Sequence, residues 1–459
     1  MKIVSRHSAA TDTAVRPRMY FVHIPKTAGI TLKAFLENHY ATGESLVIDE
    51  WKARELPAHV LQSYRLLSGH YSSEVLDALG ERPDVTIMLV REPAARFRSW
   101  MAHCRRLTTS KYRQMCEGRT DREVLDGPDG YTCHQSYWLA RALRDGANGT
   151  TVPSTGELSE LLARVDIAGT TEDIERFMQL VSFRMGWPPP QRGWHINRRP
   201  DGLTEHADQQ VTDEELDALL ESDRALYAMA KNRFWTAYSE MLCAIRPDAP
   251  AFSPESAQEV PTELVQDWLR RHFEATLAGQ YVAPVNHIDI TADRPLNGEG
   301  WWWRERPKST AYRWSGPDRE STLLAPPLVE GQDYELTLDA MGAATWRVWD
   351  EVAITINGQP VPAVHERSAP AEPGSACIRI RARVPSSAIG VQKGLTRIGL
   401  TARTEQSLTH ARVEESFDTF HNDMRMVGLA LHRVQLKAVA ALPRPVLALR
   451  RPQREGRAA

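Results

Sequence analysis

Cysteine is scarce in the 459-residue sequence: there are five, an odd number, and no two of them have CxxC spacing. This argues against a disulfide framework or a cysteine zinc site and favours a reducing compartment such as the cytoplasm. Long apolar runs are also missing, since none approaches the roughly 20 residues of a membrane-spanning helix. The N-terminal residues lack the apolar core of a secretory signal. We therefore expect a cytoplasmic protein with no membrane span.

An excess of charge of one sign is absent as well. The 56 Lys and Arg residues nearly balance the 59 Asp and Glu residues, which leaves a formal net charge of −3. The overall charge gives no reason to expect a nucleic acid or a membrane surface as partner. Hydrophobic residues make up 42% and charged residues 25%, as in globular proteins. At roughly 100–200 residues per domain, the length predicts two or three domains.

The first half of the chain alternates short apolar segments with amphipathic stretches. This pattern predicts an α/β fold, in which helices cover a parallel sheet. Strands are expected at residues 19–24, 45–49, 64–68, 85–90 and 164–169. A long helical pattern over residues 216–243, formed by one helix or two abutting ones, would close the unit. We assign residues 1–247 to this first domain.

A linker and a connecting helix are expected next, over residues 248–282. Residues 246–261 are rich in Pro, Ser and Ala, as linkers are. The amphipathic pattern of residues 262–279 predicts a helix. Its apolar stripe would consist of Leu264, Trp268, Leu269 and Phe273.

Residues 283–438 have the period-two alternation of strands and predict an all-β sandwich, jelly-roll-like in type. Asn357-Gly358 predicts a two-residue hairpin turn, and a slip in the alternation at His432 and Arg433 predicts a β-bulge. The basic segment 439–459 is expected to be a flexible tail. Strands are expected at residues 334–340, 351–361, 377–384, 395–402 and 424–436.

A loop of small and polar residues separates the first predicted strand from a helix that begins near Ile30. The loop consists of Pro25, Lys26, Thr27, Ala28 and Gly29. Its backbone N–H groups, the helix N-terminus, the lysine charge and the hydroxyls of Thr27 and Thr31 would together bind phosphate or sulfate. It is not a Walker A loop, because the lysine precedes the glycine instead of following it. The alternative is an ordinary strand–turn–helix with a surface lysine.

A second candidate anion site follows the fourth predicted strand. Arg91 lies at the carboxyl end of that strand, and Ser99 lies about two turns into the next helix. The two side chains could bind one phosphate from two directions, and an arginine can do so bidentately. The alternative for Arg91 is an ion pair with Glu92 or another acid. Arg96 and Arg98 are expected to form a solvated helix face.

Together these motifs resemble the membrane-type carbohydrate sulfotransferases, which include the heparan sulfate and dermatan/chondroitin uronyl 2-O-sulfotransferases and their bacterial relatives. The resemblance covers roughly the first half of the chain, and the ordered set is more specific than either motif alone. It rests on FVHIPKTAGIT, a Gly-His dipeptide, LVREPAARFRSW, HQSYWLA, AGTTED, an asparagine at position 197 and DRALY. It implies an α/β fold related to nucleotide kinases, with 3′-phosphoadenosine 5′-phosphosulfate (PAPS) as the sulfuryl donor.

The resemblance also implies roles for individual residues. The loop would bind the 5′-phosphosulfate through Pro25, Lys26, Thr27, Ala28, Gly29, Ile30 and Thr31. Arg91 and Ser99 would bind the 3′-phosphate.

For catalysis, the resemblance implies that His70, which follows Gly69, is the base and that Lys26 stabilises the leaving oxygen. The related enzymes often carry a second histidine two positions earlier, where this chain has Ser68. This difference bears on how the substrate is positioned. Other candidates for the base are His103, His134 and His195, of which His103 is expected to be structural.

The function expected from the sequence is therefore PAPS-dependent O-sulfation of a carbohydrate or glycolipid acceptor by in-line transfer. No metal is expected, because Arg91 stands where a Walker-B-type acid would follow its strand. The alternatives are a P-loop-like ATP-dependent phosphotransferase and a non-catalytic glycan-binding protein.

The β-rich half resembles the jelly-roll-like modules attached to bacterial glycan-processing enzymes. Its tryptophans would either bind the acceptor glycan or fill the core and the seam between domains, which would make the module structural or oligomerising. They include Trp301, Trp302, Trp303 and Trp314.

Overall fold

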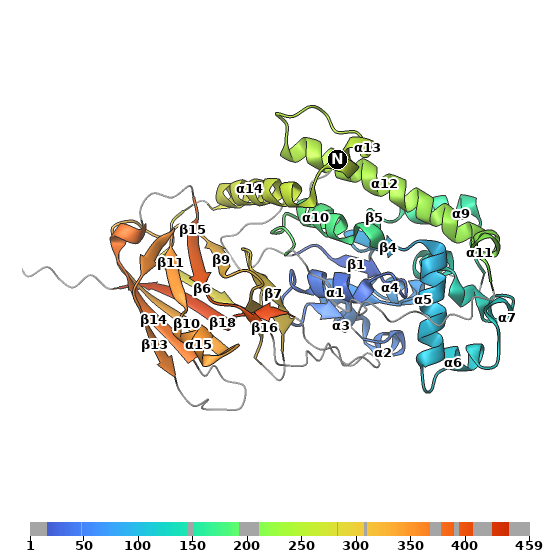
Figure 1. Ribbon diagram of the computed structural model, residues 1–459, viewed down its shortest axis with the longest axis horizontal. Helices are drawn as coiled ribbons and strands as arrows, with labels where there is room; N and C mark the ends of the chain where they lie inside the picture. Colours follow the sequence, from blue (N-terminus) through green and yellow to red (C-terminus); the bar gives the residue numbers. More distant parts are fainter. Residues whose placement is uncertain are drawn as a thin grey trace, which may run out of the picture.

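The protein is described by a computed structural model, which shows an α/β region followed by a β-rich region (Figure 1). His195, Asn197, Cys377 and the basic segment after residue 439 lie outside the described residues. The structure describes residues 16–46, 48–144, 151–191, 211–281, 283–306, 310–367, 378–389, 394–406 and 425–439.

The α/β region contains a five-stranded sheet in the order β2-β3-β1-β4-β5, and every pair of neighbours is parallel. All five predicted strands are confirmed, because each is a short apolar run that the sheet buries. The strands are β1 (Met19–Val22), β2 (Ser45–Leu46), β3 (Leu66–Gly69), β4 (Val85–Val90) and β5 (Ile167–Thr170).

Helices cover both faces of this sheet, as Figure 1 shows. Met19 and Phe21 of β1 pack into a core with α1, α10 and part of α12, whereas Tyr20 and Val22 pack into a second core with α8 and α9. Successive side chains of a strand point to opposite faces, so both faces of a covered sheet must be apolar. The helices are α1 (Gly29–Glu37), α2 (Glu50–Glu55), α3 (Ala58–Ser63), α4 (Ser73–Asp77), α5 (Pro93–Arg106), α6 (Lys111–Cys116), α7 (Asp121–Leu125), α8 (Gln135–Leu143), α9 (Thr155–Ala163) and α10 (Ile174–Met185).

The long helical pattern that closes the α/β region forms two abutting helices, α11 (Asp213–Leu219) and α12 (Glu221–Ile245). The predicted linker contains one further helix, α13 (Pro254–Glu259). Ser253 caps it by accepting from the backbone N–H of Ser256, and a proline in the first turn suits a helix start.

Helix α14 (Thr262–Gln280) confirms the predicted connecting helix, but its buried stripe differs from the expected one. Leu264 is 43% exposed, so its assignment to the stripe was wrong. The stripe faces two cores in turn: its first half joins the α/β core, and its second half packs on Leu324 of the β-rich region. Its residues are Val265, Leu269, Phe273 and Leu277.

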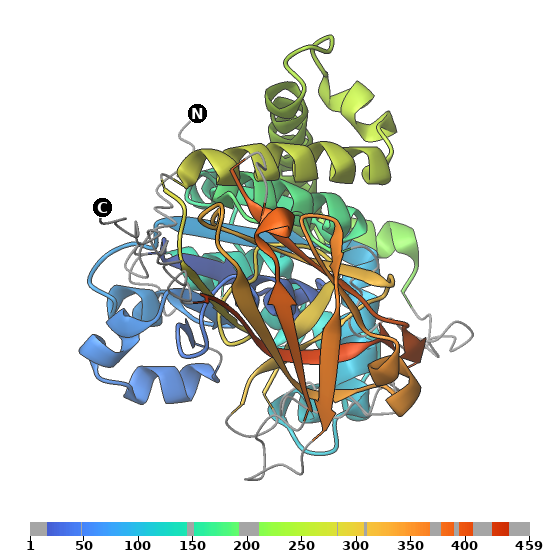
Figure 2. The same cartoon turned by 90° about the vertical axis from the view of Figure 1, so that its left-hand side faces the viewer.

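The β-rich region contains a seven-stranded and a four-stranded sheet, both antiparallel. Figure 2 views the molecule from the side of this region. Apolar side chains of both sheets form one core. A short helix, α15 (Trp346–Asp350), packs on it. The strands are β6 (His287–Thr291), β7 (Trp301–Glu305), β8 (Tyr312–Ser315), β9 (Glu320–Ala325), β10 (Tyr334–Ala343), β11 (Ala353–Ile356), β12 (Gln359–Val361), β13 (Ala363–Arg367), β14 (Ile378–Val384), β15 (Thr396–Thr401), β16 (Glu405–Gln406), β17 (Met426–Val427) and β18 (Leu429–Ala438).

Two local predictions in this region are confirmed. Asn357 and Gly358 have φ angles of 54° and 80° and join β11 to β12, as a hairpin turn with two left-handed residues requires. In the pairing of β10 with β18, the register shifts next to Asp339, and His432 is the extra residue. The tryptophans 301 and 302 are 6% and 5% exposed, so they fill the protein interior.

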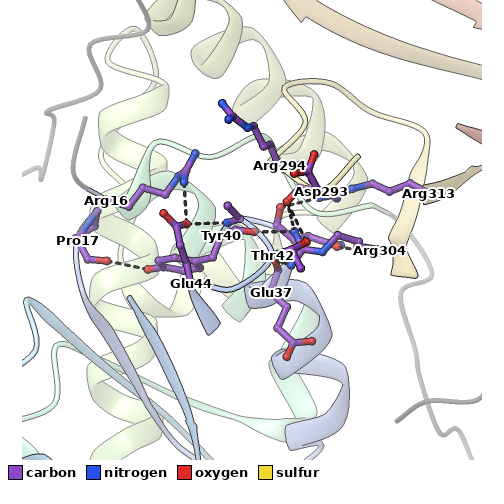
Figure 3. Close-up of polar contacts among 12 residues, drawn as sticks. Arg16, Pro17, Glu37, Tyr40, Thr42, Glu44, Asp293, Arg294, Arg304 and Arg313 are labelled. Atoms are coloured by element: carbon purple, nitrogen blue, oxygen red, sulfur yellow. Dashed lines mark hydrogen bonds and ion pairs between the residues drawn. The ribbon is translucent and has the colours of Figure 1, made fainter. Parts of the chain in front are cut away.

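The β-rich region is joined to the α/β region at the C-terminal end of α1 (Figure 3). Arg304 donates from Nη1 to the carbonyl of Tyr40 at 2.7 Å and from Nη2 to that of Glu37 at 2.9 Å. Arg313 donates from Nη2 to the carbonyl of Asn38 at 3.0 Å. The last carbonyls of a helix lack partners and carry partial negative charge. The two arginines therefore satisfy the end of the helix whose other end borders Lys26.

None of the helices in the described parts of the chain combines the length and apolar character needed to cross a bilayer.

Candidate functional site

The three predicted site segments follow three adjacent strands of the parallel sheet. His70 follows β3, the Lys26 loop follows β1, and Arg91 follows β4. Neighbouring strands lie about 4.8 Å apart, so the segments leave the sheet within about 10 Å of one another. The chain adds β2 and β3 on one side of β1 and then β4 and β5 on the other. Open α/β sheets bind ligands at such a reversal, outside the carboxyl ends of the strands.

The Lys26 loop makes a tight turn into α1. Lys26 and Ala28 have φ angles of 70° and 58°, in the left-handed region that side chains seldom adopt. Ala28 accepts from the backbone N–H of Thr31 at 3.1 Å. The fully buried Thr27 hydroxyl donates to the carbonyl of Ile24 at 2.9 Å. The Thr27 hydroxyl proton is therefore used within the loop. The backbone N–H of Thr27 remains as a donor for a ligand.

Gly29 is required by close packing at the start of α1. A Cβ at this position would lie 1.8 Å from Nε2 of His23. The His23 ring in turn stacks on the ring of His70, with centroids 4.4 Å apart. The glycine thus lets the loop, β1 and the segment after β3 converge.

Basic side chains are concentrated around the loop. Burial lowers the pKa of Lys26, and the charges of Arg106, Arg91 and Arg96 lower it further. Burial, Lys26 and Arg106 lower the pKa of His103 to about 4. None of the four cations forms an ion pair with the residues that the structure describes. Cations that repel one another without carboxylates between them form a site suited to an anion.

Arg96 is fully buried, and the expectation that it is part of a solvated helix face was wrong. Its Nε donates to the carbonyl of Pro25 at 3.0 Å and its Nη1 to the carbonyl of Cys133 at 2.5 Å. Its Nη2 is buried without a hydrogen-bond partner. The sequence contains a signal for this burial: Arg96 lies one helical turn before Trp100 and covers its ring, with 5.3 Å from Cζ to the centroid.

Arg91 is held through its backbone. The side chain of Gln135 accepts from the Arg91 N–H and donates to its carbonyl, both at 2.8 Å. Glu92 caps α5 by accepting from two backbone N–H groups. The predicted alternative, an ion pair between Arg91 and Glu92, is not formed in the described structure. Ser99 is half-buried on α5, and its hydroxyl makes no hydrogen bond to the described residues.

The geometry of His70 fixes its tautomer. Its Nδ1 lies 2.5 Å from the carbonyl oxygen of His23. A carbonyl can only accept, so Nδ1 carries the proton and Nε2 keeps a lone pair. Neighbouring protein atoms desolvate the ring and lower the pKa of His70 to about 4, although the residue is exposed. The ring is therefore neutral at pH 7.

Arg141 and Glu50 adjoin His70 and were not predicted. Arg141 donates to the His70 carbonyl at 2.7 Å and pairs with Glu50. Burial alone would raise the pKa of Glu50, but hydrogen bonds from Ser72 and Arg141 lower it to about 2. Arg141 immediately follows the HQSYWLA segment and lies over Trp138 of that segment, which is the signal that could have revealed it.

His134 has a different environment. It precedes α8, and its Nδ1 lies 4.0 Å from Oδ1 of the buried Asp223. Asp223 accepts from the backbone N–H groups of Gln135 and Ser136 and so caps α8. Burial lowers the pKa of His134. HQSYWLA and DRALY are two of the segments on which the family resemblance rests. They therefore contact each other at the N-terminus of α8.

The described residues contain no group of three His, Cys, Asp or Glu side chains arranged to hold a metal ion. A charged cofactor could be held by the basic side chains around the loop, which are Lys26, Arg91, Arg96 and Arg106.

Comparison with known proteins gives no family. No protein-family model matches the chain, and no curated protein matches it. Among solved structures, a family GH115 4-O-methyl-α-glucuronidase, BtGH115A, with specificity for decorated arabinogalactans, aligns at 11% identity and a TM-score of 0.17. The alignment covers 83% of this chain but only 58% of the glucuronidase. At this score the likeness supports no conclusion about fold or function.

Proposed function

We propose that the protein is a PAPS-dependent O-sulfotransferase that acts on a carbohydrate or glycolipid acceptor in the cytoplasm. The observation that carries the proposal is the arrangement of His70, Lys26 and Arg91 after three adjacent strands, β3, β1 and β4, around a cluster of unpaired cations. A nucleotide with phosphates at both ends offers one anion to the Lys26 loop and one to the segment that begins at Arg91. The motif resemblance and the parallel sheet agree with this assignment.

In the proposed reaction, the acceptor hydroxyl oxygen attacks the sulfur of the donor. The new S–O bond forms as the bond from sulfur to the bridging phosphate oxygen breaks. The hydroxyl proton passes to the Nε2 lone pair of His70, and Lys26 stabilises the negative charge that develops on the departing phosphate. Arg91 and Ser99 would hold the 3′-phosphate and thereby align the donor with the hydroxyl.

The proposal is tested by transfer of labelled sulfate from PAPS to a panel of neutral and acidic glycans, without added metal. We expect product with the wild-type protein, loss of at least 100-fold in rate for His70→Ala, and unchanged binding of adenosine 3′,5′-bisphosphate. His59→Ala is the matched control, because His59 is exposed on α3. Transfer that survives in His70→Ala would assign the base elsewhere, with His134 the first candidate.

Two other outcomes would replace the proposal. Phosphate transfer from ATP that requires magnesium would indicate a phosphotransferase. Glycan binding with no transfer of sulfate to any acceptor would indicate a binding protein.

A further inference from the structure

A cavity of about 300 Å³ lies between the α/β region and the β-rich region, at the C-terminal end of α1. Helix α1 has nine residues and is about 14 Å long, so the cavity is separated from the Lys26 loop by the length of the helix. Its walls come from the end of α1, from residues 188–191 after α10, from α14, from the loop before β7 and from β8 and the turn between β8 and β9. The volume is at the lower end of the range for small-molecule sites.

His39 is a buried polar side chain in the cavity wall. It is only 7% exposed, and its ring stacks on Trp187 at 4.1 Å between centroids with an angle of 7°. Its ring nitrogens form no hydrogen bond with the described residues, and neither nitrogen is fully buried, so they are open to the cavity. Burial holds the pKa of His39 well below its usual value, so the ring is neutral and has one N–H donor and one acceptor. A polar ring that is more than nine-tenths buried and has its nitrogens open only to a cavity is suited to a polar ligand.

Glu299 lines the same cavity and lies between two glycines. Gly298 and Gly300 have φ angles of 148° and 84°. A Cβ on Gly298 would lie 1.9 Å from the carbonyl oxygen of Thr322, so the loop can lie flat on β9 only with glycine there. The Oε1 of Glu299 is buried without a partner, and its Oε2 lies 3.7 Å from Arg270.

The cavity wall contains more unpaired carboxylates than unpaired cations. Asp318 and Glu320 are exposed carboxylates that form no ion pair with the described residues. Arg270 pairs with Asp267 at 3.0 Å, and Arg313 directs its donors at backbone carbonyls. An anionic ligand would therefore meet mainly uncompensated carboxylates.

The ligand must both donate and accept hydrogen bonds. The buried Oε1 of Glu299 lacks a donor, the exposed carboxylates of Asp318 and Glu320 can accept further hydrogen bonds, and the N–H of His39 can donate to an acceptor. A polyammonium ion offers donors only, but a sugar hydroxyl provides both. Trp301 is also among the residues that line the cavity.

We propose that this cavity is a binding site for a neutral saccharide of one or two rings. The proposal rests on the cavity alone and does not depend on sulfuryl transfer.

The test is saturation-transfer NMR and calorimetry on the full chain with glucose, N-acetylglucosamine, cellobiose and chitobiose as probes, and with spermidine for comparison. We expect at least one neutral sugar to bind and its affinity to fall at least tenfold in Glu299→Gln and in Asp318→Asn. Glu335→Gln, on the exposed face of β10, is the matched control and should bind as the wild type does. Thermal unfolding of each variant confirms that it is folded.

Binding of spermidine without binding of any sugar would overturn the proposal and assign a cation site. Sugar binding that is unchanged in both cavity variants would place the sugar elsewhere, and no binding of any sugar would also refute the proposal.

Discussion

His70 has a free lone pair on Nε2 because the His23 carbonyl engages its Nδ1–H, and Arg141 holds the His70 carbonyl. The ring needs no deprotonation before it can accept a proton at neutral pH. Its lowered pKa has a measurable consequence for the proposed reaction.

We predict that kcat/KM for sulfate transfer falls in acid with a midpoint near pH 4, the pKa of about 4 at His70. Above that pH the ring is neutral and active, and below it the ring is protonated and inactive. An ordinary histidine would give a midpoint near 6.5. The pH–rate profile, with an NMR titration of the His70 ring, measures this. A midpoint at pH 6–7 in both would contradict the described environment.

Arg96 supports the Lys26 loop by donating hydrogen bonds to the carbonyls of Pro25 and Cys133. Arg96→Lys keeps the charge but cannot reach both carbonyls with the same geometry. We predict that affinity for adenosine 3′,5′-bisphosphate falls about tenfold and that the free energy of unfolding falls by about 2 kcal/mol. Calorimetry and urea unfolding measure the two effects. Arg82→Lys, at an exposed position before β4, should change stability by less than about 0.5 kcal/mol, and an equal loss there would refute the role given to Arg96.

At the scale of elements, the turn between β1 and α1 depends on a residue without a side chain. A Cβ on Gly29 would overlap the His23 ring. We predict that Gly29→Ala lowers the free energy of unfolding by about 2–3 kcal/mol through overpacking. Gly156→Ala, in α9 with open space around its Cα, should be neutral or stabilise by up to about 1 kcal/mol. Urea midpoints of the two variants test the contrast, which fails if both variants are equally stable.

The elements themselves could be predicted from the sequence to a large extent. The buried run of β4 and the Asn357-Gly358 turn are local patterns, and a local pattern is sufficient to predict them. The stripe of α14 was assigned one residue too early at Leu264, because Leu264 and Trp268 have the same i, i+4 spacing as the buried Val265 and Leu269.

The candidate site could be predicted only in part. His70, Lys26 and Arg91 each follow a strand, so the sequence could place them at one edge of the sheet. The spacing of Arg96 and Trp100 indicates a contact between them, but the full burial of Arg96 also depends on where the chain brings the Cys133 carbonyl, 37 residues away. The cavity between the two regions combines segments from five parts of the chain, and no local pattern marks such a site.

At the scale of the whole molecule, the β-rich region stabilises the end of α1 opposite the Lys26 loop (Figure 3). We predict that Arg304→Ala lowers the free energy of unfolding by about 3 kcal/mol, because the carbonyls of Glu37, Tyr40 and Asp293 lose a charged donor. Urea unfolding followed by tryptophan fluorescence measures it. Arg306→Ala, at an exposed neighbouring position, should cost less than about 0.5 kcal/mol. Equal stability of the two variants would show that this contact does not join the regions.

The central claim is that one nucleotide is bound at both ends, by the Lys26 loop and by Arg91. Calorimetry with adenosine 3′,5′-bisphosphate, without magnesium, tests it most directly. We predict micromolar binding to the wild-type protein and at least a tenfold loss in each of Lys26→Ala and Arg91→Ala. No binding to the wild type, or binding that neither substitution weakens, would contradict the account.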